Sequence, residues 1–110
     1  MTTAIIANLE KLLGGPRDGA LLRYSLGNEY LKAGDFEQAA SHLRAAVERD
    51  AGYSAAWKLL GKALGAGGHA AAALAAYEQG IGVAEAKGDI QAAREMRVFA
   101  RRLQRAGTGG

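Results

Sequence analysis

The sequence contains no cysteine and only one proline among its 110 residues. The lack of cysteine excludes disulfide bonds, thiolate nucleophiles, iron–sulfur clusters and zinc sites with Cys ligands. The scarcity of proline argues against a sandwich or barrel with many turns. β-branched residues are also sparse, and no segment alternates between polar and apolar residues, so no strands are expected. These absences leave an all-α fold in a chain whose length suits a single domain, 1–110.

Long apolar segments are also missing. None approaches the ~20 residues that a membrane-spanning helix needs. The first residues, MTTAIIANLEKLL, lack the basic start of a secretory signal, and Glu10 and Lys11 interrupt their apolar part. We therefore expect no membrane span and a cytoplasmic location.

What the sequence does have is helical periodicity. Apolar residues recur at spacings of three and four, and glycine-containing breaks divide the chain. This pattern predicts six helices, near residues 3–13, 20–33, 36–49, 54–66, 70–86 and 89–106. Asp35 and Asp89 are suitable N-cap residues for the third and the last. Gly80 and Gly82 fall inside the fifth, where each is expected to cost ~1 kcal/mol relative to alanine.

The sequence also repeats itself with a period of 34 residues. Four identical pairs mark the repeat: Leu26 and Leu60, Gly27 and Gly61, Gly34 and Gly68, and Ala39 and Ala73. The small residues of these pairs lie on successive predicted helices, where they would let antiparallel helices approach closely. Larger residues in both copies, such as Leu43 and Tyr77, would fill the space around the contact.

This pattern resembles the tetratricopeptide repeat, whose signature runs Trp, Leu-Gly, a large residue, Ala, an aromatic residue and Ala. The second copy carries Trp57, Leu60-Gly61, Leu64, Ala73, Tyr77 and Gly80 at the matching positions. Arg23 stands in the Trp position of the first copy, and Gly80 departs from the last Ala. The resemblance implies a right-handed α-α superhelix with one repeat over 20–53 and another over 54–87.

The flanking segments extend this interpretation. Ile5, Leu9 and Leu12 lie one period before core positions of the first repeat, so residues 3–13 are expected to form half a repeat. One period after Trp57 and Leu60 the pattern fails, at Gln91 and Arg94. Residues 89–106 are therefore expected to form a C-terminal capping helix.

No arrangement of residues indicates an enzyme, a cofactor or a metal site. His42 and His69 have no partner with ligand spacing, and we expect both on the surface or in turns. The segment from Gly65 to Ala70 matches a dinucleotide-binding pattern in letters only, because a predicted helix precedes it where the motif needs a strand.

Resemblance to the tetratricopeptide family implies a groove lined by the first helix of each repeat, which would bind a peptide or helix of a partner protein. The candidate peptide-binding residues are Tyr24, Asn28, Lys32, Lys58 and Lys62. Two lysines one turn apart could attract an acidic peptide, and the alternative is that they are only solvated. Chaperone-binding members of the family hold a C-terminal carboxylate with a clamp of Lys, Asn and Arg residues. Only Asn28 matches a clamp position here, so that clamp is not expected.

The last predicted helix is strongly basic. Residues 87–110 carry six basic and two acidic side chains, whereas residues 1–86 carry eight and nine. Helical spacing places four arginines on one face: Arg94, Arg97, Arg101 and Arg105. This face could be a solvated cap, or it could dock on an acidic partner or a polyanion. One helix without exposed interleaved aromatics argues against nucleic acid. A further alternative is a structural or assembly protein that self-associates through its terminal helices. The expected oligomeric state is a monomer or a weak homodimer.

Overall fold

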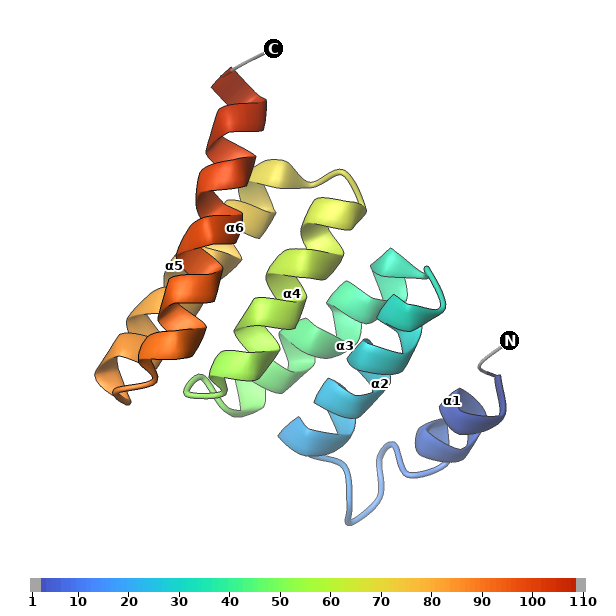
Figure 1. Ribbon diagram of the computed structural model, residues 1–110. Helices are drawn as coiled ribbons and strands as arrows, with labels where there is room; N and C mark the ends of the chain where they lie inside the picture. The colour runs from blue at the N-terminus through green and yellow to red at the C-terminus, as the bar shows by residue number, and fades with distance from the viewer. Residues whose placement is uncertain (1–2, 109–110) are drawn as a thin grey trace.

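The computed structural model describes residues 3–108 and contains six α-helices joined by short turns (Figure 1). They are α1 (Thr3–Glu10), α2 (Ala20–Lys32), α3 (Phe36–Arg49), α4 (Ser54–Ala66), α5 (Ala70–Ala86) and α6 (Ile90–Thr108). The all-α fold class and the six helices predicted from the sequence are confirmed.

Two helix ends differ from the prediction by more than one residue. The first helix ends at Glu10 and not at residue 13, because the backbone tightens into turns in which Leu12 and Leu13 bond to carbonyls three residues back. The last helix continues to Thr108 and not only to residue 106. Asp89 caps its start, since its carboxylate accepts a hydrogen bond from the Ala92 N–H at 3.2 Å. Asp35 caps α3 in the same way, through the Gln38 N–H.

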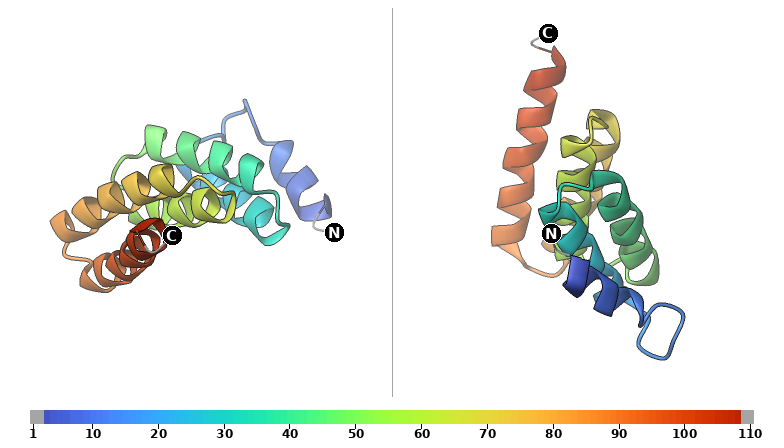
Figure 2. Two further views of the ribbon diagram at one scale, coloured as in Figure 1. Left: turned by 90° about the horizontal axis from the view of Figure 1, so that it is seen from above. Right: turned by 90° about the vertical axis from the view of Figure 1, so that its right-hand side faces the viewer.

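The helices form two rows. α2 packs on α3, α4 on α5 and α5 on α6, and α2, α4 and α6 follow one another in a single row (Figures 1 and 2). We call the surface presented by α2, α4 and α6 the inner face. α6 projects beyond α2 and α4 on the inner side, so that it borders one edge of this face (Figure 2).

Glycine determines how closely the paired helices approach. A Cβ atom on Gly27 would overlap the Leu43 side chain, and one on Gly61 would overlap the Tyr77 ring. Leu43 and Tyr77 are themselves buried, so neither can move aside without disturbing the core. The small residues of the 34-residue repeat thus serve the packing role expected of them.

Gly80 requires a correction. Its departure from alanine does not simply weaken α5, because a Cβ atom there would lie 2.5 Å from Met96 Sδ and 2.8 Å from Trp57 Cβ. Gly80 is buried where α5 packs on both α4 and α6. Gly82 differs, since it is exposed and a Cβ atom would meet nothing within 4 Å.

Three helices end in the same glycine turn. Gly34, Gly68 and Gly88 adopt φ values of +82°, +87° and +76°, a region that favours glycine. After each of them, the next N–H bonds to a carbonyl five residues back, as in the Asp35-to-Tyr30 contact. These turns satisfy carbonyl groups at the helix ends and reverse the chain.

Arg23 and Trp57, which occupy equivalent positions in the two repeats, both contact the loop before their own helix, through different chemistry. Arg23 forms a two-pronged ion pair with Asp18, through Nε at 3.0 Å and Nη2 at 3.1 Å. Trp57 donates its indole N–H to the carbonyl of Ala51 at 2.9 Å. Each side chain reaches back to the loop before its own helix. The ion pair with Arg23 also holds the pKa of the Asp18 carboxyl far below its usual range, chiefly through the hydrogen bond from Arg23.

The docking of α1 differs in part from the sequence prediction. Ile5, predicted to be a core residue, is 54% exposed, and Ile6 is buried in its place. Leu9 and Leu12 do pack against the apolar cluster that Ile6 shares with α2. Because α1 is only eight residues long, few apolar side chains define the side that it buries. The contact of Ile6 and Leu9 with α2 therefore decides the orientation of the helix.

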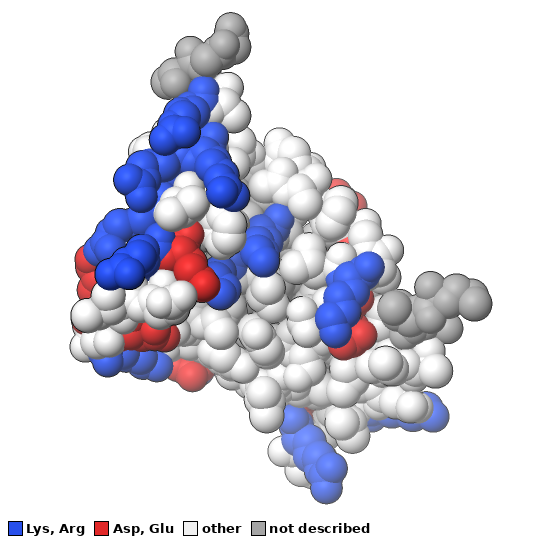
Figure 3. Space-filling view, in the orientation of Figure 1, with Lys and Arg blue, Asp and Glu red and all other residues white. Residues whose placement is uncertain are grey.

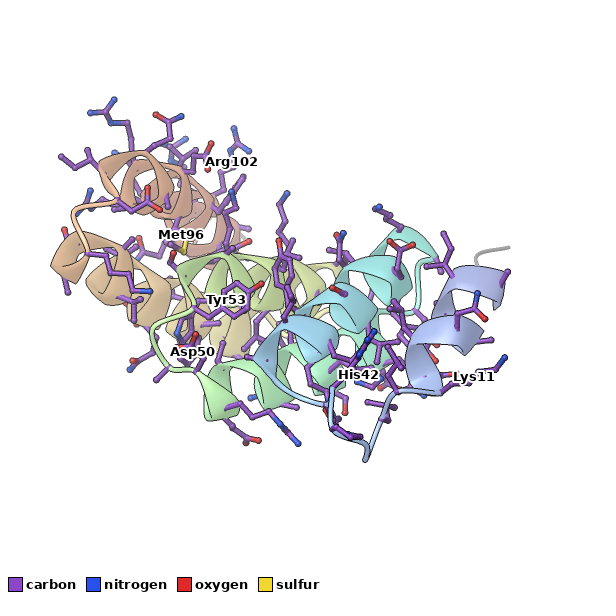
Figure 4. All side chains as sticks on the ribbon, turned by 90° about the horizontal axis from the view of Figure 1, so that it is seen from below. Lys11, His42, Asp50, Tyr53, Met96 and Arg102 are labelled. Atoms are coloured by element: carbon purple, nitrogen blue, oxygen red, sulfur yellow. The ribbon has the colours of Figure 1, made fainter. Side chains whose placement is uncertain are left out.

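His42 is also a correction, since it is buried and not on the surface. Its ring stacks on that of Tyr30 at 5.5 Å between centroids, and Nδ1 has no hydrogen-bond partner. Burial, followed by repulsion from Arg23, lowers the pKa of the His42 imidazole. Figure 4 shows His42 inside the stack of helices, far from α6.

Candidate functional site

The first part of the inner face lies on α2. The Tyr24 ring stacks on the Tyr53 ring, with 4.9 Å between centroids, and is partly buried against the core. Asn28, one turn further along, is half-buried. Lys32 is exposed and pairs with Glu29 at 3.3 Å. Tyr24 therefore has a packing role in addition to any contact with a partner.

The second part of the inner face joins α4 to α6. Lys58 Nζ of α4 lies 2.8 Å from Glu95 Oε1 of α6, so these two residues, 37 positions apart in the chain, form an ion pair between the helices. The hydrogen bond from Lys58 and its charge lower the pKa of the Glu95 carboxyl, and Lys62 adds to the effect. Lys58 is thus already paired, and its positive charge is largely neutralised.

Lys62 has a different environment. Its Nζ lies 5.6 Å from the centroid of the Phe99 ring on α6, and Arg102 Cζ lies 5.8 Å from the same centroid. Both distances are within the range of cation–π contacts. Among the described residues, no carboxylate lies within ion-pair distance of Lys62 or Arg102. This part of the inner face therefore carries three cations, Lys58, Lys62 and Arg102, against the single carboxylate of Glu95.

A pocket of about 250 Å³ opens beside the Phe99 ring, between α4 and α6. Its walls consist of apolar or small residues with two cations at the rim: Gly61, Lys62, Gly65, Ala66, Tyr77, Phe99, Arg102 and Leu103. The Tyr77 and Phe99 rings lie 5.6 Å apart and are tilted toward each other. The pocket is below the roughly 300–1,000 Å³ of sites that hold whole small molecules, so its size suits one side chain.

The basic residues predicted on the last helix lie along α6 and are exposed: Arg94, Arg97, Arg101 and Arg105. Helical spacing places them on the side of α6 opposite Phe99, so they do not line the pocket. Arg97 pairs with Glu85 of α5, and Arg105 also takes part in an interaction. Figure 3 shows Lys and Arg side chains gathered along α6 and over the neighbouring part of α4.

The sequence prediction did not identify three residues of this region, Glu95, Phe99 and Arg102. Phe99 is partly buried against the apolar cluster that α6 shares with Tyr77 and Ala84 of α5. A signal was present, because Glu95, Phe99 and Arg102 are spaced so that they lie on one face of a helix. What the sequence did not contain is the position of this face opposite Lys58 and Lys62 of α4.

Among residues 3–108, no group of three or more His, Cys, Asp or Glu side chains could hold a metal ion. Within the same range, no helix is both long enough and apolar enough to cross a membrane. What the inner face can do chemically is bind: it combines exposed cations, an amide and an apolar pocket.

Comparison with known proteins gives consistent matches. The family model of the tetratricopeptide repeat matches residues 20–63. A TPR repeat-containing protein of Pseudomonas aeruginosa is 55% identical over 104 residues, which cover 94% of this chain and 99% of that protein. A Bordetella parapertussis protein of known solution structure is 44% identical, with a TM-score of 0.80 over 93% of this chain and 89% of that chain. A tetratricopeptide repeat domain protein of Salinibacter ruber is 28% identical, with a TM-score of 0.71 over 80% of this chain and 88% of that chain.

Proposed function

The chain belongs to the tetratricopeptide-repeat family. From this we propose that it is a non-enzymatic interaction module, which binds a peptide or helix of a partner protein on its inner face. Proteins built from stacked helical repeats commonly use such an extended surface for binding. No relative reported above carries an enzyme name. The observation that carries the proposal is the inner face itself, on which α2, α4 and α6 place binding groups side by side.

The predicted binding residues contribute unequally to this proposal. Asn28 and Lys62 offer an amide and a cation that are accessible on successive inner helices. Lys32 forms an ion pair with Glu29, and Lys58 forms one with Glu95. The negative charge of each carboxylate therefore offsets the positive charge of its lysine. The excess of positive charge around Lys62 favours an acidic partner.

The experiment compares two charge reversals. Lys62→Glu changes the inner face, and Arg101→Glu makes the same change on the basic side of α6, which is the alternative docking surface. Partner proteins are captured from the native host with the unmodified protein, and the affinity of the purified partner is then measured for both variants. We expect Lys62→Glu to weaken binding about tenfold, or 1.4 kcal/mol, and Arg101→Glu to change it little.

Two results would contradict the proposal. Loss of binding in Arg101→Glu alone would move the interface to the basic side of α6. Equal retention by both variants and by Asn28→Arg would remove the inner face as the binding surface. Circular dichroism of each variant checks that the helical fold is intact, which we expect because Asn28, Lys62 and Arg101 are outside the core clusters.

A further inference from the structure

We propose that the pocket between α4 and α6 binds a bulky apolar side chain that is flanked by carboxylates in an acidic peptide segment. This inference rests on the proposed function and specifies the chemistry of the partner. Its basis is the combination of an apolar pocket with two cations on one rim, Lys62 and Arg102, that pair with no carboxylate among residues 3–108. Neither feature alone would define the ligand, because cations are common on surfaces and shallow apolar pockets occur on most proteins.

The pocket is lined by two glycines, Gly61 and Gly65, of which packing requires only the first. A Cβ atom on Gly61 would overlap Tyr77, so Gly61 is required by packing. A Cβ atom on Gly65 would lie 3.8 Å from Ala73 Cβ and 3.9 Å from Leu103 Cδ2, which is ordinary contact. Gly65 also lies in the last turn of α4 without a positive φ. Neither packing nor backbone conformation therefore requires glycine at 65, and its small size leaves space between α4 and α6.

The floor and walls of the pocket are suited to an apolar group. The Tyr77 and Phe99 rings and the Leu103 side chain form most of the apolar surface. Tyr77 is buried, and its burial raises the pKa of the phenol to about 12, so the ring stays neutral. An aromatic side chain entering the pocket would make edge or offset contacts with both rings, the geometries that aromatic pairs favour.

The rim selects for negative charge. Lys62 and Arg102 both approach the Phe99 ring, and no described carboxylate pairs with either of them. An arginine can bind a carboxylate through two parallel hydrogen bonds, and a lysine adds a point charge. The cations of this region favour the ionised form of a carboxylate, because Lys58 and Lys62 lower the pKa of the Glu95 carboxyl. Carboxylates next to the inserted side chain would be held ionised in the same way.

The test uses a short synthetic peptide with blocked ends, in which a central Phe is flanked on both sides by Asp within a Gly-Ser background. Amide NMR spectra of the full chain are recorded during the titration. We expect shifts at Gly65, Phe99 and Leu103, and binding that weakens as salt is added. Replacing the Asp residues with Asn, or the central Phe with Ala, should each weaken binding at least about tenfold.

Matched variants separate the pocket from the rest of the surface. Gly65→Leu fills the pocket and should weaken peptide binding at least about tenfold. Gly82→Leu makes the same change at an exposed position of α5 and should leave binding unchanged. Because Gly65→Leu could also disturb the packing of α6, the double variant Lys62→Gln and Arg102→Gln tests the rim with the pocket intact. It should abolish the preference for Asp over Asn.

Each remaining outcome overturns the pocket assignment. Three results would each contradict it. The amide signals do not shift at the highest peptide concentration, the Asn peptide binds as tightly as the Asp peptide, or Gly65→Leu binds the peptide as tightly as the unmodified protein. Shifts at Tyr24 and Asn28 that are insensitive to Gly65→Leu would overturn the pocket and leave inner-face binding standing. The proposed function itself fails only if neither Lys62→Glu nor Asn28→Arg changes the affinity of the natural partner.

Discussion

At the scale of single residues, the glycines of this protein differ in what their positions require. Gly34, Gly68 and Gly88 adopt a left-handed backbone in turns. Gly27, Gly61 and Gly80 lie where helices touch, and a side chain would collide with a neighbour. Gly82 meets neither condition, so it weakens α5 without a packing reason.

This difference predicts opposite effects of one substitution at two positions of the same helix. Gly80→Ala should destabilise the fold by about 1–3 kcal/mol, because Trp57 Cβ is fixed to its backbone and cannot yield. Gly82→Ala should stabilise it by up to about 1 kcal/mol. Urea unfolding of both variants measures the two free energies. If both changes stabilised the protein equally, the close contact at Gly80 would be wrong.

At the scale of helices, α1 is the most weakly attached element. Among the described helices it packs on α2 alone, and less extensively than α2 packs on α3, α4 on α5 or α5 on α6. Its contact combines Ile6 and Leu9 with a hydrogen bond from the Tyr30 hydroxyl to Glu10 at 2.6 Å. That bond, with burial, raises the pKa of the Tyr30 phenol to about 12.

We therefore predict that α1 opens locally. Its amide protons should exchange faster than those of α2 to α5, and Ile6→Ala should speed exchange in α1 at least about tenfold. Ile5→Ala is the control at the neighbouring, 54% exposed position, and it should change exchange in α1 little. Hydrogen exchange followed by NMR gives both rates. Uniform acceleration across all six helices would show that α1 unfolds only with the whole molecule.

At the scale of the whole molecule, the ends of the stack determine whether copies associate. Among the residues whose side chains the structure describes, the exposed large apolar ones are Ile5 at 54%, Leu21 at 70% and Ile90 at 64%, each on a different helix. Single exposed apolar residues do not form a patch that needs cover. The outer side of α6 carries Arg94 and Arg101, which would repel the same side of a second copy.

We expect the protein to be a monomer, in line with one of the two states predicted from the sequence. Sedimentation velocity over a wide range of concentrations should give a constant coefficient at moderate salt. A dimer that persists on dilution would contradict this expectation. Ile5→Asp would then show whether the α1 end forms the contact, since it would dissociate a dimer built there and leave any other dimer intact.

The sequence by itself determined the helices and the repeat. Periodicity placed six helices within a few residues, because each apolar stripe and each glycine break is a local property. The 34-residue repeat placed Gly27 and Gly61 at close contacts, because the same packing problem recurs in each hairpin. Prediction was weaker at α1, where a short helix has too few apolar residues to fix which of Ile5 and Ile6 is buried.

Only the tertiary structure decided what α6 does on the inner face. It brought Glu95 to Lys58, and Phe99 and Arg102 to Lys62, across 37 residues or more of chain. It also showed that Gly80 is needed for packing and that His42 is buried. The physical reason is the same in each case: helical spacing fixes which side chains share a face, and only the packing of helices decides what that face meets.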